Sequence, residues 1–120
     1  MSDVRVGESL KGSPIDLGFL AQNTAGDRKL GREVLNIFKE QSNQYLAALE
    51  AADTPSAWRD AAHTLKGAAR AIGARKVARL AEEAELMGDG SPRAEALNAL
   101  RRAVNEARRF IDIQLLDAAH

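Results

Sequence analysis

The strongest constraint on the fold is the spacing of apolar residues between positions 58 and 72. Placed at about 100° per residue, these side chains gather on one face of a helix. The members of this stripe are Trp58, Ala61, Ala62, Leu65, Ala69 and Ile72. The spacing predicts an amphipathic helix that buries one face and exposes the other.

His63 lies about 150° from the centre of that stripe, so we expect its side chain to face solvent. Arg59, Lys66 and Arg70 fall on the same side of the helix as His63. Gly67, one turn later, leaves the space beside the imidazole empty, although a mid-helix glycine costs about 1 kcal/mol relative to alanine. The pattern indicates a histidine that a large partner can reach.

Turn and capping residues divide the rest of the chain into further helices. Asp16 and Asp27 are suited to begin two of them, and Gly73 is suited to end the histidine helix. Thr54 or Ser56 can cap the start of that helix. We expect a short helix from residue 15, then helices over about 27–52, 55–72, 74–87 and from 91 to near the C-terminus.

In the second of these helices the predicted inward face is broad, which suggests contact with more than one neighbour. It comprises Leu30, Val34, Ile37, Phe38, Gln41, Tyr45 and Leu49, widened by Leu35 and Leu46. The short links between helices favour antiparallel neighbours. The sequence therefore predicts an all-α, up-down four-helix bundle with a short additional N-terminal helix. Residues 1–14 are expected to be a flexible lead-in to a single domain over 15–118.

Composition agrees with this fold class and excludes several functions. The 120 residues are 45% apolar but only 4% aromatic, with Ala and Leu as the main apolar types. A net charge of zero argues against broad nucleic-acid binding, and the absence of cysteine excludes disulfides and thiolate metal sites. No apolar run has the length of a membrane span or of a signal-peptide core. We expect a cytoplasmic monomer with neither a nucleic-acid nor a membrane partner.

The run His63-Thr64-Leu65-Lys66-Gly67, followed by Ile72-Gly73, resembles the phosphorylation-site helix of histidine-containing phosphotransfer (Hpt) domains of bacterial two-component phosphorelays. The resemblance extends over about residues 15–118. It implies that Nε2 of His63 accepts a phosphoryl group from a receiver-domain aspartate and passes it to another receiver. The implied partners are receiver domains of response regulators and of a hybrid histidine kinase.

The resemblance further implies a phosphocarrier without autokinase activity. The chain is too short to include a nucleotide-binding kinase domain, and no cofactor or metal is expected in it. Mg²⁺ is expected on the partner receiver domain.

The chemistry of the residues fits this role. Imidazole titrates near neutrality and is then a free nucleophile. We expect Arg59, Lys66 and Arg70 to disfavour the imidazolium form. With His63, Lys66 and Arg70 form the expected catalytic set, meeting the phosphoryl charge. The expected docking residues are Arg59, Thr64, Gly67 and Ala68. Family members often have small polar residues where this chain has Ala68 and Ala69.

Other readings remain open from sequence alone. Glu82, Glu83 and Glu85 could suggest a metal site, but no histidine stands at Glu-x-x-His spacing, so we interpret them as a solvated face. A helical hairpin of a histidine kinase is one alternative, although such hairpins usually have an acidic residue where this chain has Thr64. A non-catalytic helical adaptor that binds receivers is another, but it would need no nucleophile at position 63.

Overall fold

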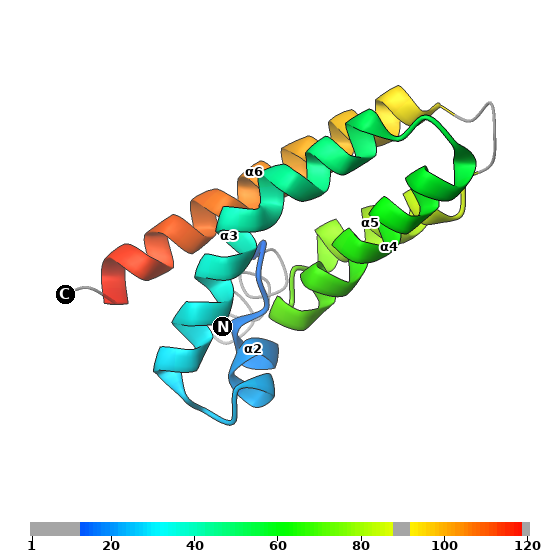
Figure 1. Cartoon of the computed structure of the whole chain (residues 1–120). Helices are drawn as coiled ribbons and strands as arrows, with labels where there is room; N and C mark the ends of the chain where they lie inside the picture. The colour runs from blue at the N-terminus through cyan, green and yellow to red at the C-terminus, as the bar shows by residue number, and fades with distance from the viewer. Residues whose placement is uncertain (1–12, 88–91, 119–120) are drawn as a thin grey trace, which may run out of the picture.

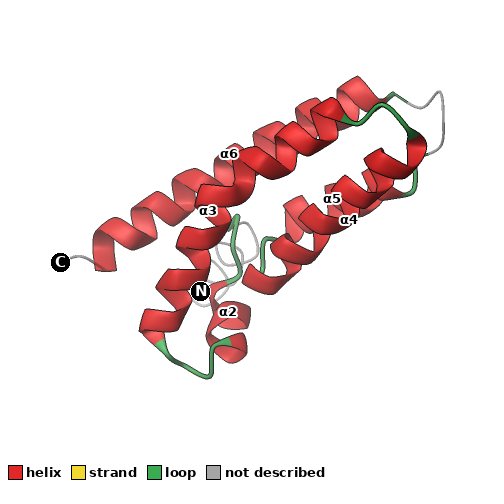
Figure 2. Ribbon diagram, in the orientation of Figure 1, coloured by secondary structure: helices red, strands yellow, loops and turns green. Residues whose placement is uncertain are grey.

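The structure is a computed structural model that describes residues 13–87 and 92–118. Within this part the chain is helical and contains no strand (Figure 2). The helices are α2 (Leu17–Asn23), α3 (Arg28–Ala51), α4 (Pro55–Ile72), α5 (Arg75–Glu85) and α6 (Arg93–Ala118). The predicted all-α class is confirmed. None of these helices is both long and apolar enough to cross a membrane.

The four longer helices form the predicted bundle. Helix α3 packs on α4, α4 on α5, α5 on α6, and α6 returns to α3. Successive helices run in opposite directions, as the colour gradient in Figure 1 shows. The short helix α2 contacts α3 and α4 and so adds to the bundle rather than forming a fifth member of its ring. The up-down topology with an additional N-terminal helix is therefore confirmed.

Local chemistry fixes both ends of α4. The Thr54 hydroxyl accepts a hydrogen bond from the Ala57 backbone N–H at 3.0 Å, and Pro55 occupies the first turn. At the other end Gly73 adopts φ 78°, the left-handed conformation that terminates many helices. The predicted bounds of this helix are confirmed at both ends.

The turn after α4 also anchors α2. The Asp16 side chain caps α2 by accepting from the Phe19 N–H at 3.0 Å, and the Asp16 N–H donates to the Gly73 carbonyl at 2.9 Å. A Cβ atom on Gly73 would lie 2.9 Å from the Asp16 carbonyl oxygen. Of the predicted flexible lead-in, residues 1–12 lie outside the described part, while Ser13 and Pro14 are half-buried.

The stripe of α4 is buried as predicted. Leu65, Ala62 and Ala69 are fully enclosed, and Ala61 at the edge of the stripe is half-buried. Trp58 is buried as well, and its indole N–H donates to the Ala84 carbonyl on α5 at 2.7 Å. This bond satisfies the single polar group of the indole and ties α4 to α5.

The predicted inward face of α3 is partly wrong. Ile37 is 50% exposed and Leu30 is 41% exposed, whereas Leu35 and Leu46 are buried in the core. The apolar arc of α3 is wider than the bundle can cover, and packing selects one side of it. Ser42 lies on the buried side of α3 although it is polar. Its hydroxyl donates to the Lys39 carbonyl at 2.8 Å, so its burial leaves no unpaired polar atom.

Candidate functional site

His63 stands in the middle of α4 on the face opposite the core. Its side chain is 67% exposed, while Leu65 and Ala62 beside it in sequence are fully buried. The capped, fully packed helix therefore fixes the backbone of His63 and leaves its ring open to solvent. The predicted outward orientation of His63 is confirmed.

Helix α5 brings a carboxylate to the ring. Glu85 Oε2 lies 2.8 Å from Nδ1 of His63, and the other oxygen, Oε1, lies 2.5 Å from Nζ of Lys66. The Glu85 side chain is only 17% exposed, so it is held between the two partners. The interpretation of Glu85 as part of a solvated face is therefore wrong.

A signal for this contact was present in the sequence. His63 lies eleven residues before Ala74 and Glu85 lies eleven residues after it. In an antiparallel helical hairpin that turns at Gly73–Ala74, residues equally distant from the turn lie at the same level. The missing information was the rotation of each helix about its own axis, which decides whether two residues at one level face each other.

The two contacts define the charge of Glu85. The hydrogen bond from Lys66, followed by that from His63, lowers the pKa of the Glu85 carboxyl below its ordinary value of 4.5, although partial desolvation acts in the opposite direction. Glu85 is therefore a carboxylate at neutral pH.

This carboxylate sets the tautomer of the ring. An ionised carboxylate only accepts hydrogen bonds, so the 2.8 Å contact requires the proton to be on Nδ1 of His63. In the neutral ring, Nε2 then carries the free lone pair. Nε2 makes no hydrogen bond or ion pair to any residue within 13–87 or 92–118. The site thus presents a nucleophilic nitrogen to solvent with its other nitrogen fixed.

The positive surroundings expected for His63 are partly neutralised. Lys66 is paired with Glu85, and Arg70 lies 3.4 Å from Glu82 on α5. Arg70 stands seven residues beyond His63, about 10 Å along the helix axis. Arg59 makes no ion pair with any residue of the described part. The surroundings of the ring are therefore less positive than these three cations alone would make them, because α5 brings carboxylates to the same face.

The opposite flank of the ring is open. A Cβ atom built on Gly67 has nothing within 4 Å, which confirms the empty space predicted there. The Thr64 hydroxyl donates to the Asp60 carbonyl at 3.0 Å and leaves the flank uncovered. Beyond it, Ala68 lines an apolar groove of about 210 Å³ between α3 and α4, to which the exposed Ile37 also contributes. His63 therefore lies between a flank towards α5, which carries the Glu85–Lys66 ion pair, and a flank towards α3 with the small side chains of Thr64, Gly67 and Ala68.

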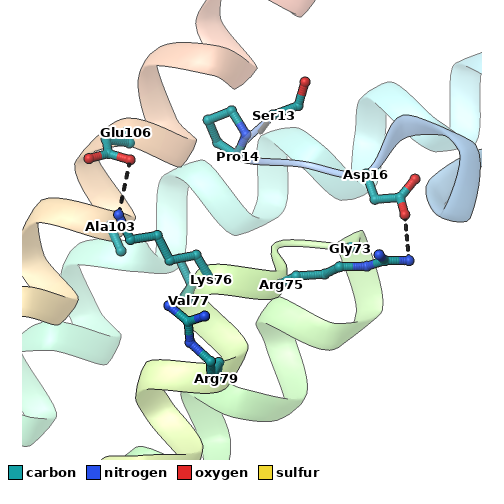
Figure 3. A pocket seen from close by; sticks show the side chains of 10 residues that line it. All are labelled: Ser13, Pro14, Asp16, Gly73, Arg75, Lys76, Val77, Arg79, Ala103 and Glu106. Carbon is teal, nitrogen blue, oxygen red and sulfur yellow. Dashed lines mark ion pairs between the residues drawn. The ribbon is translucent and has the colours of Figure 1, made fainter. Parts of the chain in front are cut away.

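A separate hollow of about 520 Å³ lies at the other end of α5 and contains none of the predicted site residues (Figure 3). Its cations face carboxylates: Arg75 pairs with Asp16 at 2.6 Å, and Lys76 approaches Glu106 at 3.8 Å. Across the described ranges, no group of three or more His, Cys, Asp or Glu side chains is arranged to hold a metal ion.

Comparison with known proteins supports the resemblance to Hpt domains that the motif around His63 indicates. A family model described as the Hpt domain matches residues 33–110, which is more than half of the chain and runs from α3 through α6. No curated protein and no solved structure matches the chain. Hpt domains take part in phosphotransfer in two-component signalling, where they interact with receiver domains. The helical bundle, the exposed histidine and this match together show that the chain belongs to the Hpt domain family.

Proposed function

We propose that this Hpt domain accepts a phosphoryl group on Nε2 of His63 from the aspartyl phosphate of one receiver domain and passes it to the aspartate of another. The observation that carries the proposal is the ring geometry. Nδ1 is held by Glu85 at 2.8 Å, Nε2 has no partner within the described part, and the side chain is 67% exposed.

The transfer step needs one nucleophile and no cofactor in this chain. The Nε2 lone pair attacks phosphorus and forms the N–P bond. The bond between phosphorus and the aspartyl oxygen breaks, and its electron pair leaves with the receiver carboxylate. The second transfer is the reverse of the first, with the second receiver's carboxylate as nucleophile. Mg²⁺ held by the receiver would neutralise the phosphoryl charge in both steps.

Lys66 and Arg70 are proposed to meet the charge of the bound phosphoryl group. Lys66 is one turn from His63, and its ammonium already lies on the ring's charged flank. To contact phosphoryl oxygens, the Lys66 ammonium must leave the Glu85 carboxylate and pair with the phosphoryl group instead. Arg70 is more distant and 58% exposed, so it suits a contact with the docked receiver's phosphoryl group better than one with the resting ring.

The flank towards α3 is proposed as the docking side. Thr64, Gly67 and Ala68 present small side chains beside the ring, and the apolar groove continues from Ala68 to Ile37 on α3. Arg59 lies one turn before His63 and completes the rim. In this proposal a receiver that rests on this surface brings its aspartate over the ring. A non-catalytic adaptor would leave the Glu85-held imidazole without a role.

The test is phosphorylation of His63→Gln beside His120→Gln, since these are the two histidines of the chain. After incubation with a radiolabelled phosphorylated receiver, the parent protein and His120→Gln should carry acid-labile label. His63→Gln should carry none while keeping the helical circular-dichroism spectrum of the parent. Persistent label on His63→Gln would contradict the proposal.

A further inference from the structure

The end of the bundle that contains the start of α3 and the end of α6 extends beyond the α4–α5 hairpin (Figure 1). Lys76, near the start of α5, lies 3.8 Å from Glu106, so α6 continues for about three turns past the start of α5. Those turns lie beside α3, as the ion pair between Lys39 and Asp112 shows. Among the described residues, the short helix α2 is the further element that lies against the start of α3.

A groove of about 490 Å³ lies between α2, the start of α3 and the end of α6, and we call it the α2–α3 groove. The apolar side chains of its lining are Leu17, Leu20, Ala21 and Leu35. Helix α6 contributes Gln114, and on the same turns Ile113 and Leu116 are 56% and 62% exposed. Apolar surface therefore continues from the groove onto the last turns of α6, which suits a partner larger than a small molecule.

The rim of the α2–α3 groove carries cations. Arg28 and Arg32 line the groove, and Lys29 follows Arg28 in the same helix; all three side chains are exposed. None of the three forms an ion pair or a side-chain hydrogen bond with any other residue in the described part of the chain. Their charges are therefore available to a partner.

The carboxylates at this end do not cancel these cations. Asp27 accepts a hydrogen bond from the Leu30 N–H at 3.1 Å and so serves as the cap of α3. Glu33 is exposed and does not line the groove. Asp112 on α6 is paired with Lys39. The rim keeps an excess of positive charge beside an apolar lining.

The start of α3 also contains residues that are unfavourable for a helix. The helix dipole disfavours cations in the first turn, yet Arg28 and Lys29 are the first two residues and the first turn contains no acidic residue. Gly31 lines the groove inside the helix, where glycine lowers stability. A Cβ atom there would lie 4.0 Å from Leu20 and from Thr24, an ordinary contact, so packing does not require the glycine. Residues that break local rules without a packing reason are expected at functional surfaces.

We propose that the α2–α3 groove binds an acidic amphipathic helix of a partner protein. The apolar side chains of that helix lie against α2 and α3, and its carboxylates pair with Arg28 and Arg32. An apolar groove between helices is a common binding site for one face of an amphipathic helix. The planar guanidinium group matches the geometry of a carboxylate, so unpaired arginines at the rim select an acidic partner.

This site is separate from the surface proposed for receivers. Ile37 and Ala68 line the groove between α3 and α4, whereas Arg32 and Leu35 line the α2–α3 groove. His63 lines neither of them. A partner helix bound at the α2–α3 groove therefore leaves His63 accessible, and the inference goes beyond the phosphotransfer proposed above without depending on it.

The test measures binding of a synthetic peptide to the whole chain. The probe is a fluorescein-labelled helical peptide of about five turns, with leucine along one face and glutamate over the other. A second peptide has lysine in place of every glutamate. Fluorescence anisotropy should give a Kd for the acidic peptide about tenfold or more below that for the basic peptide. The difference should shrink as the salt concentration rises, because salt screens exposed charges.

Charge reversal at the rim tests the arginines. Arg28→Glu/Arg32→Glu should raise the Kd for the acidic peptide by about tenfold or more, because two attractions become repulsions. The matched control is Arg102→Glu/Arg109→Glu, at two exposed arginines of α6 that lie outside the groove and form no ion pair within the described residues. Its Kd should equal that of the parent. Urea melts of the rim variant should show no loss of stability, because glutamate is favourable at the start of a helix.

A second pair of variants tests the groove itself. Ala21 lines the groove and is exposed, whereas Gln22, the next residue of α2, is exposed outside the lining. Ala21→Glu should weaken binding of the acidic peptide, and Gln22→Glu should weaken it less. In NMR spectra of the backbone amides, the acidic peptide should shift the signals of Ala21 and Gly31 and leave that of His63 in place.

Three results would overturn the inference. The first is a parental Kd for the acidic peptide in Arg28→Glu/Arg32→Glu. The second is binding of the parent to phosphatidylglycerol vesicles but not to the acidic peptide, which would identify a membrane as the partner. The third is a parental dimer in sedimentation runs that dissociates in the rim variant, which would assign the groove to a second copy of this chain.

Phosphotransfer distinguishes this inference from the proposed function. Arg28→Glu/Arg32→Glu should accept label from a phosphorylated receiver at the parental rate. Slower transfer would place the receiver in the α2–α3 groove and overturn the inference. If His63 of the parent takes no label while the acidic peptide binds as expected, the proposed phosphotransfer fails and the inference about the groove stands.

Discussion

At the scale of a single residue, Gly67 lowers the stability of its helix and leaves one flank of His63 open to an approaching partner. It lies within α4, where glycine is unfavourable by about 0.8–1.0 kcal/mol relative to alanine. The space above it is empty, with no atom within 4 Å of a Cβ built there. No packing requirement explains the absence of a side chain, so the role proposed for this glycine is to keep the flank of His63 open.

This role predicts opposite effects on stability and transfer. Gly67→Leu should be at least as stable as the parent in denaturant melts, because it removes the glycine penalty. Its transfer from a phosphorylated receiver should slow by about tenfold or more, which corresponds to about 1.4 kcal/mol in the barrier. Gly67→Ala should gain stability but lose less of the transfer rate, since only one carbon enters the open space. Parental transfer by Gly67→Leu would mean that the receiver approaches from elsewhere.

At the scale of elements, the connection between α4 and α5 decides where Glu85 lies. Gly73 reverses the chain in a left-handed conformation, and its carbonyl accepts from the Asp16 N–H at 2.9 Å. One glycine thus ends the histidine helix, starts the return to α5 and holds α2. The level at which α5 passes His63 depends on this turn.

The connection can be tested with a matched pair of glycines. Gly73→Ala and Gly26→Ala both place alanine at positive φ, 78° and 76°, which costs about 1–2 kcal/mol. At Gly26 the added Cβ meets nothing within 4 Å, whereas at Gly73 it would lie 2.9 Å from the Asp16 carbonyl oxygen. Urea unfolding should therefore show a larger loss of stability for Gly73→Ala than for Gly26→Ala. Equal losses would show that α2 moves aside without cost.

At the scale of the whole molecule, Glu85 links the charged site to folding. Its pKa is lowered in the folded protein, so the folded state binds a proton less readily than the unfolded chain. A group of this kind contributes stability above its unfolded pKa and loses it as the pH falls through the folded value. The contacts of Glu85 with Lys66 and His63 should therefore weaken in acid.

The measurement is a set of urea melts of the parent and Glu85→Gln between about pH 3 and pH 5, the window around the ordinary Glu pKa. The difference in unfolding free energy between the two proteins should shrink as the pH falls, because protonated Glu85 resembles glutamine. For Glu83→Gln the difference should vary less, since the Glu83 carboxylate makes only the 3.8 Å contact with Arg79. A difference that is constant over this window would mean that the folded environment does not favour the Glu85 carboxylate.

The sequence by itself determined what depends on interactions within one element. The ends of α4 follow from Thr54 and Gly73, and the outward orientation of His63 follows from the 3.6-residue period of the stripe around Leu65. Hydrogen bonds within a helix and the periodic placement of apolar and polar residues involve positions a few residues apart, so they can be predicted from the local sequence.

Only the tertiary structure decided how one helix faces another. The apolar arc of α3 allowed several rotations about the helix axis, and packing buried Leu35 and Leu46 while leaving Ile37 half exposed. In the same way, the rotation of α5 turned Glu85 towards His63 and Lys66 rather than towards solvent. These choices depend on the summed contacts of the whole core, so the face of His63 was predictable from its own helix and the partner of its Nδ1 was not.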